Sequence, residues 1–147
     1  MKAPHPWEVT TVRTVLNIIW LVFGGFLLAL GYVVAGVICC IFIVTIPFGI
    51  ASFRMAGYII WPFGKAVVER PGAGAGSAIM NVIWFILAGW WLALGHILAA
   101  IAESLTIIGL INAVALLKMI PVTCFPFGKM IVDRESLPAN ARPLSSI

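Results

Sequence analysis

Charged residues are spaced so that two long apolar runs are left between them. Forty residues before Arg54 carry no charge, and another 32 uncharged residues precede Glu103. Because a helix crosses a bilayer in about 20 residues, each run predicts a pair of membrane-spanning helices. Gly31 in the first run and Gly95 in the second mark the expected chain reversals within each pair.

The second run is a copy of the first. Adding 64 to each number between Asn17 and Arg70 aligns this stretch with residues 81–134 without a gap, and 18 of the 54 aligned residues are identical. Such similarity indicates two copies of one module. The sequence therefore predicts an all-α integral membrane protein with two tandem helical-hairpin repeats, in which four transmembrane helices form parallel repeats with interfacial segments.

The distribution of positive charge predicts the orientation. If each repeat is an up-down hairpin, all nine Lys and Arg residues fall on one side of the membrane, and the positive-inside rule places that side and both termini in the cytoplasm. The expected segments are a cytoplasmic N-terminal segment (1–13), repeat 1 with an interfacial segment (14–70), a Gly-rich linker (71–77), repeat 2 (78–134) and a cytoplasmic tail (135–147).

Composition narrows the functional classes. Hydrophobic residues make up 63 % of the chain, well above the roughly 45 to 50 % of soluble domains. The positive charges stand singly, so a nucleic-acid partner is not expected. The sequence contains no nucleotide-binding loop, catalytic triad or metal-ligand pattern, which predicts neither an enzyme nor a bound cofactor or metal.

Two sets of residues suit the membrane environment. Small residues recur at helical spacing and are expected at helix-packing contacts, where backbones approach closely; they are Gly24, Gly25, Gly31, Ala88, Gly89 and Gly95. Aromatic and basic residues near helix ends are expected to anchor at the membrane interface; they are Trp7, Arg54, Trp61, Lys65, Lys118 and Lys129.

Glu103 is the most informative polar residue. About eight residues beyond a reversal at Gly95, it is expected near the bilayer midplane, where a charge costs at least ~2.5 to 3.5 kcal/mol. Either it lines an ion path or binds a cation or proton, or it is protonated and hydrogen-bonds a neighbouring helix. The asparagines favour hydrogen bonds between helices. Candidates for a pore or ion path are Glu103, His96 at the rim, Asn17, Asn81 and Asn112.

Several short motifs occur together in this chain: RTVLNI at 13–18, GWW at 89–91 with His96 beyond it, TIIG at 106–109, and PFGK at 62–65 and 126–129. In combination they resemble the YccF family of small bacterial inner-membrane proteins. The resemblance covers residues 13–134. It implies a location in the bacterial inner membrane and no established activity.

Three functions remain compatible with the sequence. The first is an oligomeric inner-membrane protein that forms or contributes to an ion-conducting channel, which accounts for the cost of burying Glu103. The second is a non-transporting membrane scaffold or accessory subunit, and the third is a small transporter. The expected partners are the lipid bilayer, further copies of the chain and a possible unidentified membrane protein.

Overall fold

The computed structural model describes residues 5–138 and 140–147. In repeat 1 a π-helical turn joins two helices, a 3-10 turn leads into a third, and one strand follows. These elements are α1 (Pro6–Trp20), the π turn Leu21–Gly25, α2 (Phe26–Ile41), the 3-10 turn Ile43–Thr45, α3 (Ile46–Ile60) and β1 (Lys65–Glu69).

Repeat 2 follows the same plan. Its elements are α4 (Ala75–Trp84), the π turn Phe85–Gly89, α5 (Trp90–Ser104), α6 (Gly109–Cys124) and β2 (Lys129–Asp133), followed by the 3-10 turn Arg134–Ser136 and β3 (Ser145–Ser146). The mainly helical fold with two tandem hairpins is confirmed. Two helix boundaries fall inside segments that were expected to be non-helical. Helix α1 begins at Pro6, within the expected N-terminal segment, and α4 includes the last three residues of the expected linker.

The chain reversals are not where the sequence placed them. Gly31 lies inside α2 and Gly95 inside α5, whereas the hairpins turn at residues 42–45 and 105–108. Threonine hydroxyls satisfy backbone groups there: Thr45 Oγ1 donates to the Phe42 carbonyl at 2.9 Å, and Thr106 Oγ1 accepts from the Gly109 amide at 3.0 Å. Local hydrogen bonding therefore helps to set both turns, and the second also needs a glycine, because a Cβ atom on Gly109 would collide with the Glu103 carbonyl group.

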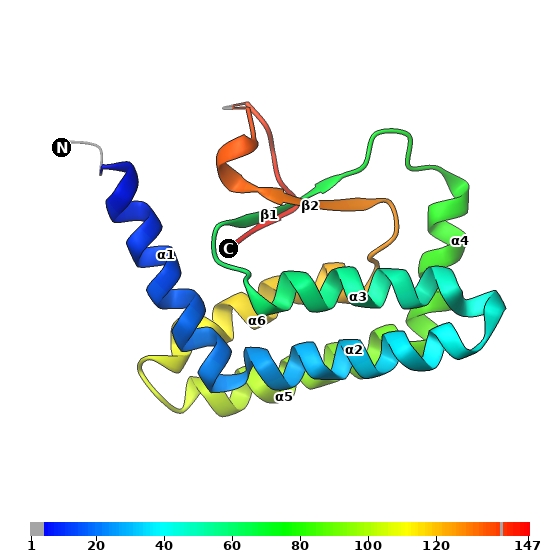
Figure 1. The fold of residues 1–147 in the computed structure, drawn as a ribbon, viewed down its shortest axis with the longest axis horizontal. Coiled ribbons are helices and arrows are strands. Elements are labelled where there is room, and N and C mark those ends of the chain that lie inside the picture. The colour runs from blue at the N-terminus through cyan, green and yellow to red at the C-terminus, as the bar shows by residue number, and fades with distance from the viewer. Residues whose placement is uncertain (1–4, 139) are drawn as a thin grey trace.

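The two hairpins point in opposite directions. Figure 1 shows the α2–α3 turn at one end of the molecule and the α5–α6 turn at the other, with α3 and α6 between the sheet and the α2 and α5 layer. The parallel repeats that were expected are related by an axis along the membrane normal, and hairpins that lie across such a twofold axis also point in opposite directions. The arrangement follows from the sheet, where β1 and β2 pair antiparallel and Val67 faces Ile131, its equivalent in the other copy. A pseudo-twofold axis thus passes between these two residues.

The sheet begins at the two Pro-Phe-Gly-Lys turns. Gly64 has a φ of +97° and Gly128 a φ of +76°, a backbone conformation that favours glycine. The expected turns are therefore present, but each leads into a strand that was not predicted. The strand order is β2-β1-β3, so β3 covers the outer edge of β1.

Polar and apolar surfaces are separated. Around the sheet, Arg13 pairs with Glu135, and the Lys65 ammonium lies 2.6 Å from the Asp133 carboxylate. The helices instead expose apolar side chains, including the hairpin-turn residue Ile43 at 83 %. Three helical stretches are long and apolar enough to cross a membrane, namely Pro6–Ile41, Ile43–Ile60 and Ala75–Ser104. Lys2 lies outside the described residues.

Candidate functional site

Asn17 and Asn81 hold the Pro-Phe-Gly-Lys turns against the helices. The Asn17 amide accepts a hydrogen bond from the Phe63 backbone N–H at 2.9 Å and donates to its carbonyl at 3.0 Å. Asn81 makes the same two bonds to Phe127, also at 2.9 and 3.0 Å. Both amides are engaged by backbone groups, so this geometry gives them a structural role rather than a place on an ion path.

Trp20 on α1 and Trp84 on α4 lie three residues after the two asparagines and bind the backbone just before the same turns. Trp20 Nε1 donates to the Ile59 carbonyl at 2.6 Å, and both indoles are fully buried. A Cβ atom on Gly25 would collide with the Trp20 indole, and one on Gly89 would lie 3.2 Å from the Trp84 ring. Gly25 and Gly89 therefore allow the indoles to lie close to the backbone.

Of the remaining candidates, the two glycines make no close contact, and the aromatic and basic anchors lie at or near the surface. A Cβ atom on Gly31 would meet no atom within 4 Å, and one on Gly95 would make only an ordinary contact at 3.8 Å, so neither glycine serves a close approach within the chain. Trp7 and Trp61 are 66 % and 40 % exposed. Lys118 lies beside β3 and donates to the Ser146 carbonyl at 3.2 Å.

His96 lies in the interior rather than at the rim. The rim position depended on a reversal at Gly95, and α5 continues through that residue. His96 Nε2 lies 3.2 Å from the hydroxyl of Tyr32, its equivalent in the other copy, and that hydroxyl donates to Thr123 Oγ1 at 2.8 Å. All three side chains are fully buried. This cluster joins the two repeats at the pseudo-twofold axis.

Glu103 and Asn112 form the polar pair that the fold leaves unsatisfied. Glu103 is the penultimate residue of α5, next to the hairpin turn, so a count from Gly95 no longer gives its depth in the membrane. The side chains are only 7 % and 1 % exposed. The Asn112 amide neighbours the carboxylate, yet neither group has a hydrogen-bond partner among the described residues.

The Glu103 carboxylate lies over the kink between α1 and α2. A Cβ atom on Gly24 would be 2.5 Å from Glu103 Oε1, so a larger residue at position 24 would make the carboxylate move. Gly24 is also the residue at which the backbone leaves the helical conformation, with φ 179° and ψ −22°. The carboxylate and the helix break therefore occupy one location.

The equivalent location in the other half of the molecule is apolar. Cys39, Phe48 and Ala88 stand where Glu103, Asn112 and Gly24 would be, and the Phe48 ring packs in the aromatic core. The carboxylate, the amide and the kink therefore occur together at one end of a pseudo-symmetric fold.

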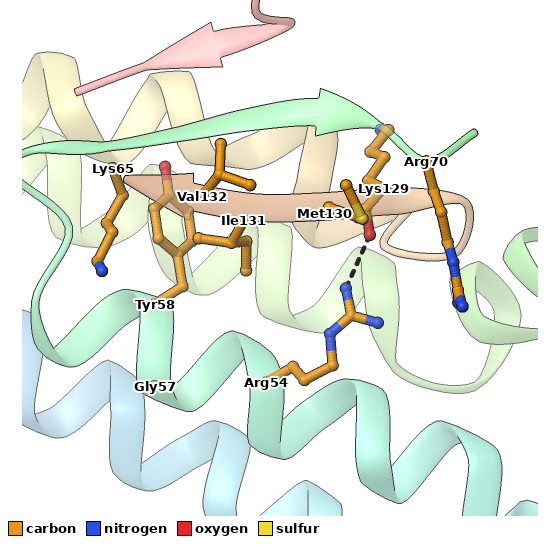
Figure 2. A pocket seen from close by; sticks show the side chains of 9 residues that line it. All are labelled: Arg54, Gly57, Tyr58, Lys65, Arg70, Lys129, Met130, Ile131 and Val132. Atoms are coloured by element: carbon orange, nitrogen blue, oxygen red, sulfur yellow. Dashed lines mark hydrogen bonds between the residues drawn. The ribbon is translucent and has the colours of Figure 1, made fainter. Parts of the chain in front are cut away.

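A second polar feature is a basic pocket of about 520 Å³ between α3 and β2. Figure 2 shows Arg54 reaching up from α3 and Arg70 reaching down from the end of β1, with Tyr58 and Lys65 toward the other end. The sequence pointed to Arg54 and Lys65 only as separate anchors. It gave no signal for a pocket, because the strand pairing that brings these residues together was not predicted.

Comparisons with known proteins agree on one family. The model of the inner membrane component domain YccF matches residues 15–65 and 79–129. Inner membrane protein YccF of Escherichia coli (strain K12) is 33 % identical over 144 residues, which cover 89 % of this chain and 97 % of that protein. The protein of the same name from Shigella flexneri has the same identity and coverage. No solved structure matches the chain.

Proposed function

The chain belongs to the YccF family of inner membrane components, and from this premise we propose that its copies assemble into a cation-conducting unit with Glu103 as the cation-binding group. The observation that carries the proposal is the buried carboxylate of Glu103, which has no hydrogen-bond partner among the residues described by the structure.

An ionised carboxylate in this position needs a compensating partner. A charge among membrane helices costs at least ~2.5 to 3.5 kcal/mol and in known proteins faces a partner or an ion pathway. Glu103 and Asn112 together offer carboxylate and amide oxygens, which are the ligands that hard cations prefer. A bound cation or proton therefore satisfies groups that the chain leaves unsatisfied.

The helix break at Gly24 supports a cation-binding site at Glu103. Interrupted helices in membrane proteins expose backbone groups and accompany ion-binding sites. Here the break faces the carboxylate, whereas the residue equivalent to Glu103 in the first repeat is the neutral Cys39. The π turn Phe85–Gly89 joins its two helices without a non-helical residue such as Gly24, so the hairpin fold requires neither that residue nor the carboxylate.

Assembly and orientation complete the proposal. Glu103 is buried within one chain, so the path runs beside the kink of each subunit rather than through a ring of carboxylates between subunits. A homo-oligomer supplies the enclosing walls that one small chain lacks. The charged sheet faces the cytoplasm under the positive-inside rule. A particle mass in nanodiscs that corresponds to one chain contradicts the assembly.

The test is cation flux into sealed liposomes that contain the purified protein. The wild-type protein should carry flux above that of empty vesicles, and Glu103→Gln, which removes the charge while keeping the shape, should bring flux close to the empty-vesicle rate. Cys39→Ser changes the equivalent position and should leave flux unchanged. Absence of flux with the wild-type protein refutes conduction and favours a membrane scaffold, whereas unchanged flux in Glu103→Gln refutes the role of the carboxylate.

A further inference from the structure

We propose that the basic pocket between α3 and β2 binds the phosphate group of an anionic ligand, carried either by a phospholipid headgroup or by free phosphate. This inference is independent of conduction, because the pocket and Glu103 lie in different parts of the molecule: the pocket borders the sheet, and Glu103 lies at the α5–α6 turn.

Two arginines supply uncompensated charge to the pocket. Arg54 Nη2 donates to the Lys129 carbonyl at 2.8 Å, which orients the guanidinium and leaves its other N–H groups available. Arg70 has no ion pair among the described residues. Figure 2 shows both guanidinium groups between β2 and α3. Such planar donor groups match the oxygens of a phosphate.

The two lysines of the pocket are already engaged. Lys65 pairs with Asp133 at 2.6 Å, and the Lys129 ammonium donates to the Pro121 carbonyl at 3.2 Å. Glu69 lies opposite Lys129 in the strand pair. A carbonyl does not neutralise an ammonium group, so the charge that remains for a ligand is that of the two arginines together with Lys129.

Tyr58 lines the pocket at the end away from the two guanidinium groups (Figure 2). Its side chain is only 2 % exposed, and its hydroxyl is buried without a hydrogen-bond partner among the described residues. Tyr58 therefore forms part of the wall of the pocket, and the guanidinium groups at the other end can reach a phosphate.

The pseudo-symmetry explains why this pocket stays open. Lys118 and Arg134 are the equivalents of Arg54 and Arg70 in the second copy. On their side of the sheet β3 pairs with β1, and the Ser146 carbonyl accepts a hydrogen bond from Lys118. The sheet order β2-β1-β3 leaves the outer edge of β2 without a strand among the described residues. The C-terminal strand thus occupies part of one of the two equivalent places, where a smaller pocket of about 410 Å³ remains beside Lys118 and Arg134, and leaves the other more open to a ligand.

The surroundings of the pocket favour a lipid over free phosphate. On α3, the helix that carries Arg54, Ile50, Phe53 and Ile60 are 56 %, 41 % and 42 % exposed. The arginines therefore border an apolar surface on which acyl chains can lie while the headgroup reaches the guanidinium groups, as basic residues at membrane surfaces do with anionic lipids.

Native mass spectrometry and thermal unfolding of the full chain in detergent test the proposal. The probes are dioleoyl phosphatidylglycerol, the zwitterionic dioleoyl phosphatidylcholine and inorganic phosphate. Arg54→Gln with Arg70→Gln removes two charges from the open pocket. Lys118→Gln with Arg134→Gln removes the same charge from the covered side and is the matched control. If the first pair fails to fold, Arg70→Gln alone replaces it, because that side chain makes no ion pair.

We expect the wild-type protein and the control to bind phosphatidylglycerol in preference to phosphatidylcholine. Phosphatidylglycerol should raise the melting temperature of both proteins above the value measured without lipid. The open-pocket variant should bind it about tenfold more weakly, the loss expected for one charge-assisted hydrogen bond. Stabilisation by inorganic phosphate that is lost in the same variant identifies free phosphate as the source of the anion. Equal binding by the two variants, or no binding of either anion by the wild-type protein, overturns the proposal.

Discussion

Replacing Asn17 by alanine tests whether this buried amide holds the first Pro-Phe-Gly-Lys turn. The side chain is fully buried and makes two hydrogen bonds, to the Phe63 N–H and carbonyl at 2.9 and 3.0 Å. Each buried polar group left without a partner costs about 1 to 3 kcal/mol. We therefore expect Asn17→Ala to lower the free energy of unfolding by about 4 kcal/mol, the middle of the range summed over the two groups.

Unfolding in mixed micelles, followed by far-ultraviolet circular dichroism as the denaturing detergent is titrated, gives this free energy. Asn81→Ala is the matched comparison, because Asn81 makes the same pair of bonds from a partly buried position. Water can replace those bonds in part, so Asn81→Ala should cost less. A loss below ~1 kcal/mol for Asn17→Ala, or a larger loss for Asn81→Ala, would refute the clamp.

Three further results are expected. A Cβ atom on Gly24 would lie 2.5 Å from Glu103 Oε1, so Gly24→Ala should lower the melting temperature, and adding Glu103→Ala should recover part of the loss; no recovery contradicts the contact. Ile43 and Ile107 are 83 % and 89 % exposed in uncharged hairpin turns, which we expect to lie in lipid. In a chain whose own cysteines are replaced by alanine, single cysteines at these positions should resist both permeant and impermeant maleimide, because maleimide reacts with a thiolate, which does not form in lipid. Reaction with the impermeant reagent shows that the turns reach water. Burial lowers the pKa of Lys129 below its ordinary value of 10.5. Between the lowered value and 10.5 the unfolded chain binds more protons than the folded chain, so the free energy of unfolding should rise with pH in this range. Lys129→Gln should remove that rise.

The repeat and the Pro-Phe-Gly-Lys turns could be read from the sequence because they depend on local features. Identical residues at a constant offset of 64 reveal the two copies, and positive φ values at Gly64 and Gly128 explain why glycine stands in both turns. The hairpin reversals were missed because side chains facing lipid are apolar on every side, so hydropathy does not mark where such a helix ends. Thr45, which satisfies a turn carbonyl, was the signal available.

The site could be predicted only in part. Glu103 stands out as a lone carboxylate in an apolar stretch, but nothing in the sequence places it against Gly24, 79 residues earlier in the chain. The basic pocket depends on the antiparallel pairing of β1 with β2, and each of these strands is only five residues long. Contacts between distant short segments carry no local pattern, so the sequence named some of their residues without bringing them together.

The most direct test of the proposed function is the reversal potential of the purified protein in a planar bilayer under a potassium chloride gradient. If Glu103 is the cation-binding group, currents of the wild-type protein should reverse close to the potassium equilibrium potential, because a carboxylate on the path favours cations over anions. Glu103→Gln should reduce the current or move the reversal potential toward zero. A wild-type reversal potential near zero, or one that Glu103→Gln leaves unchanged together with the conductance, contradicts the account.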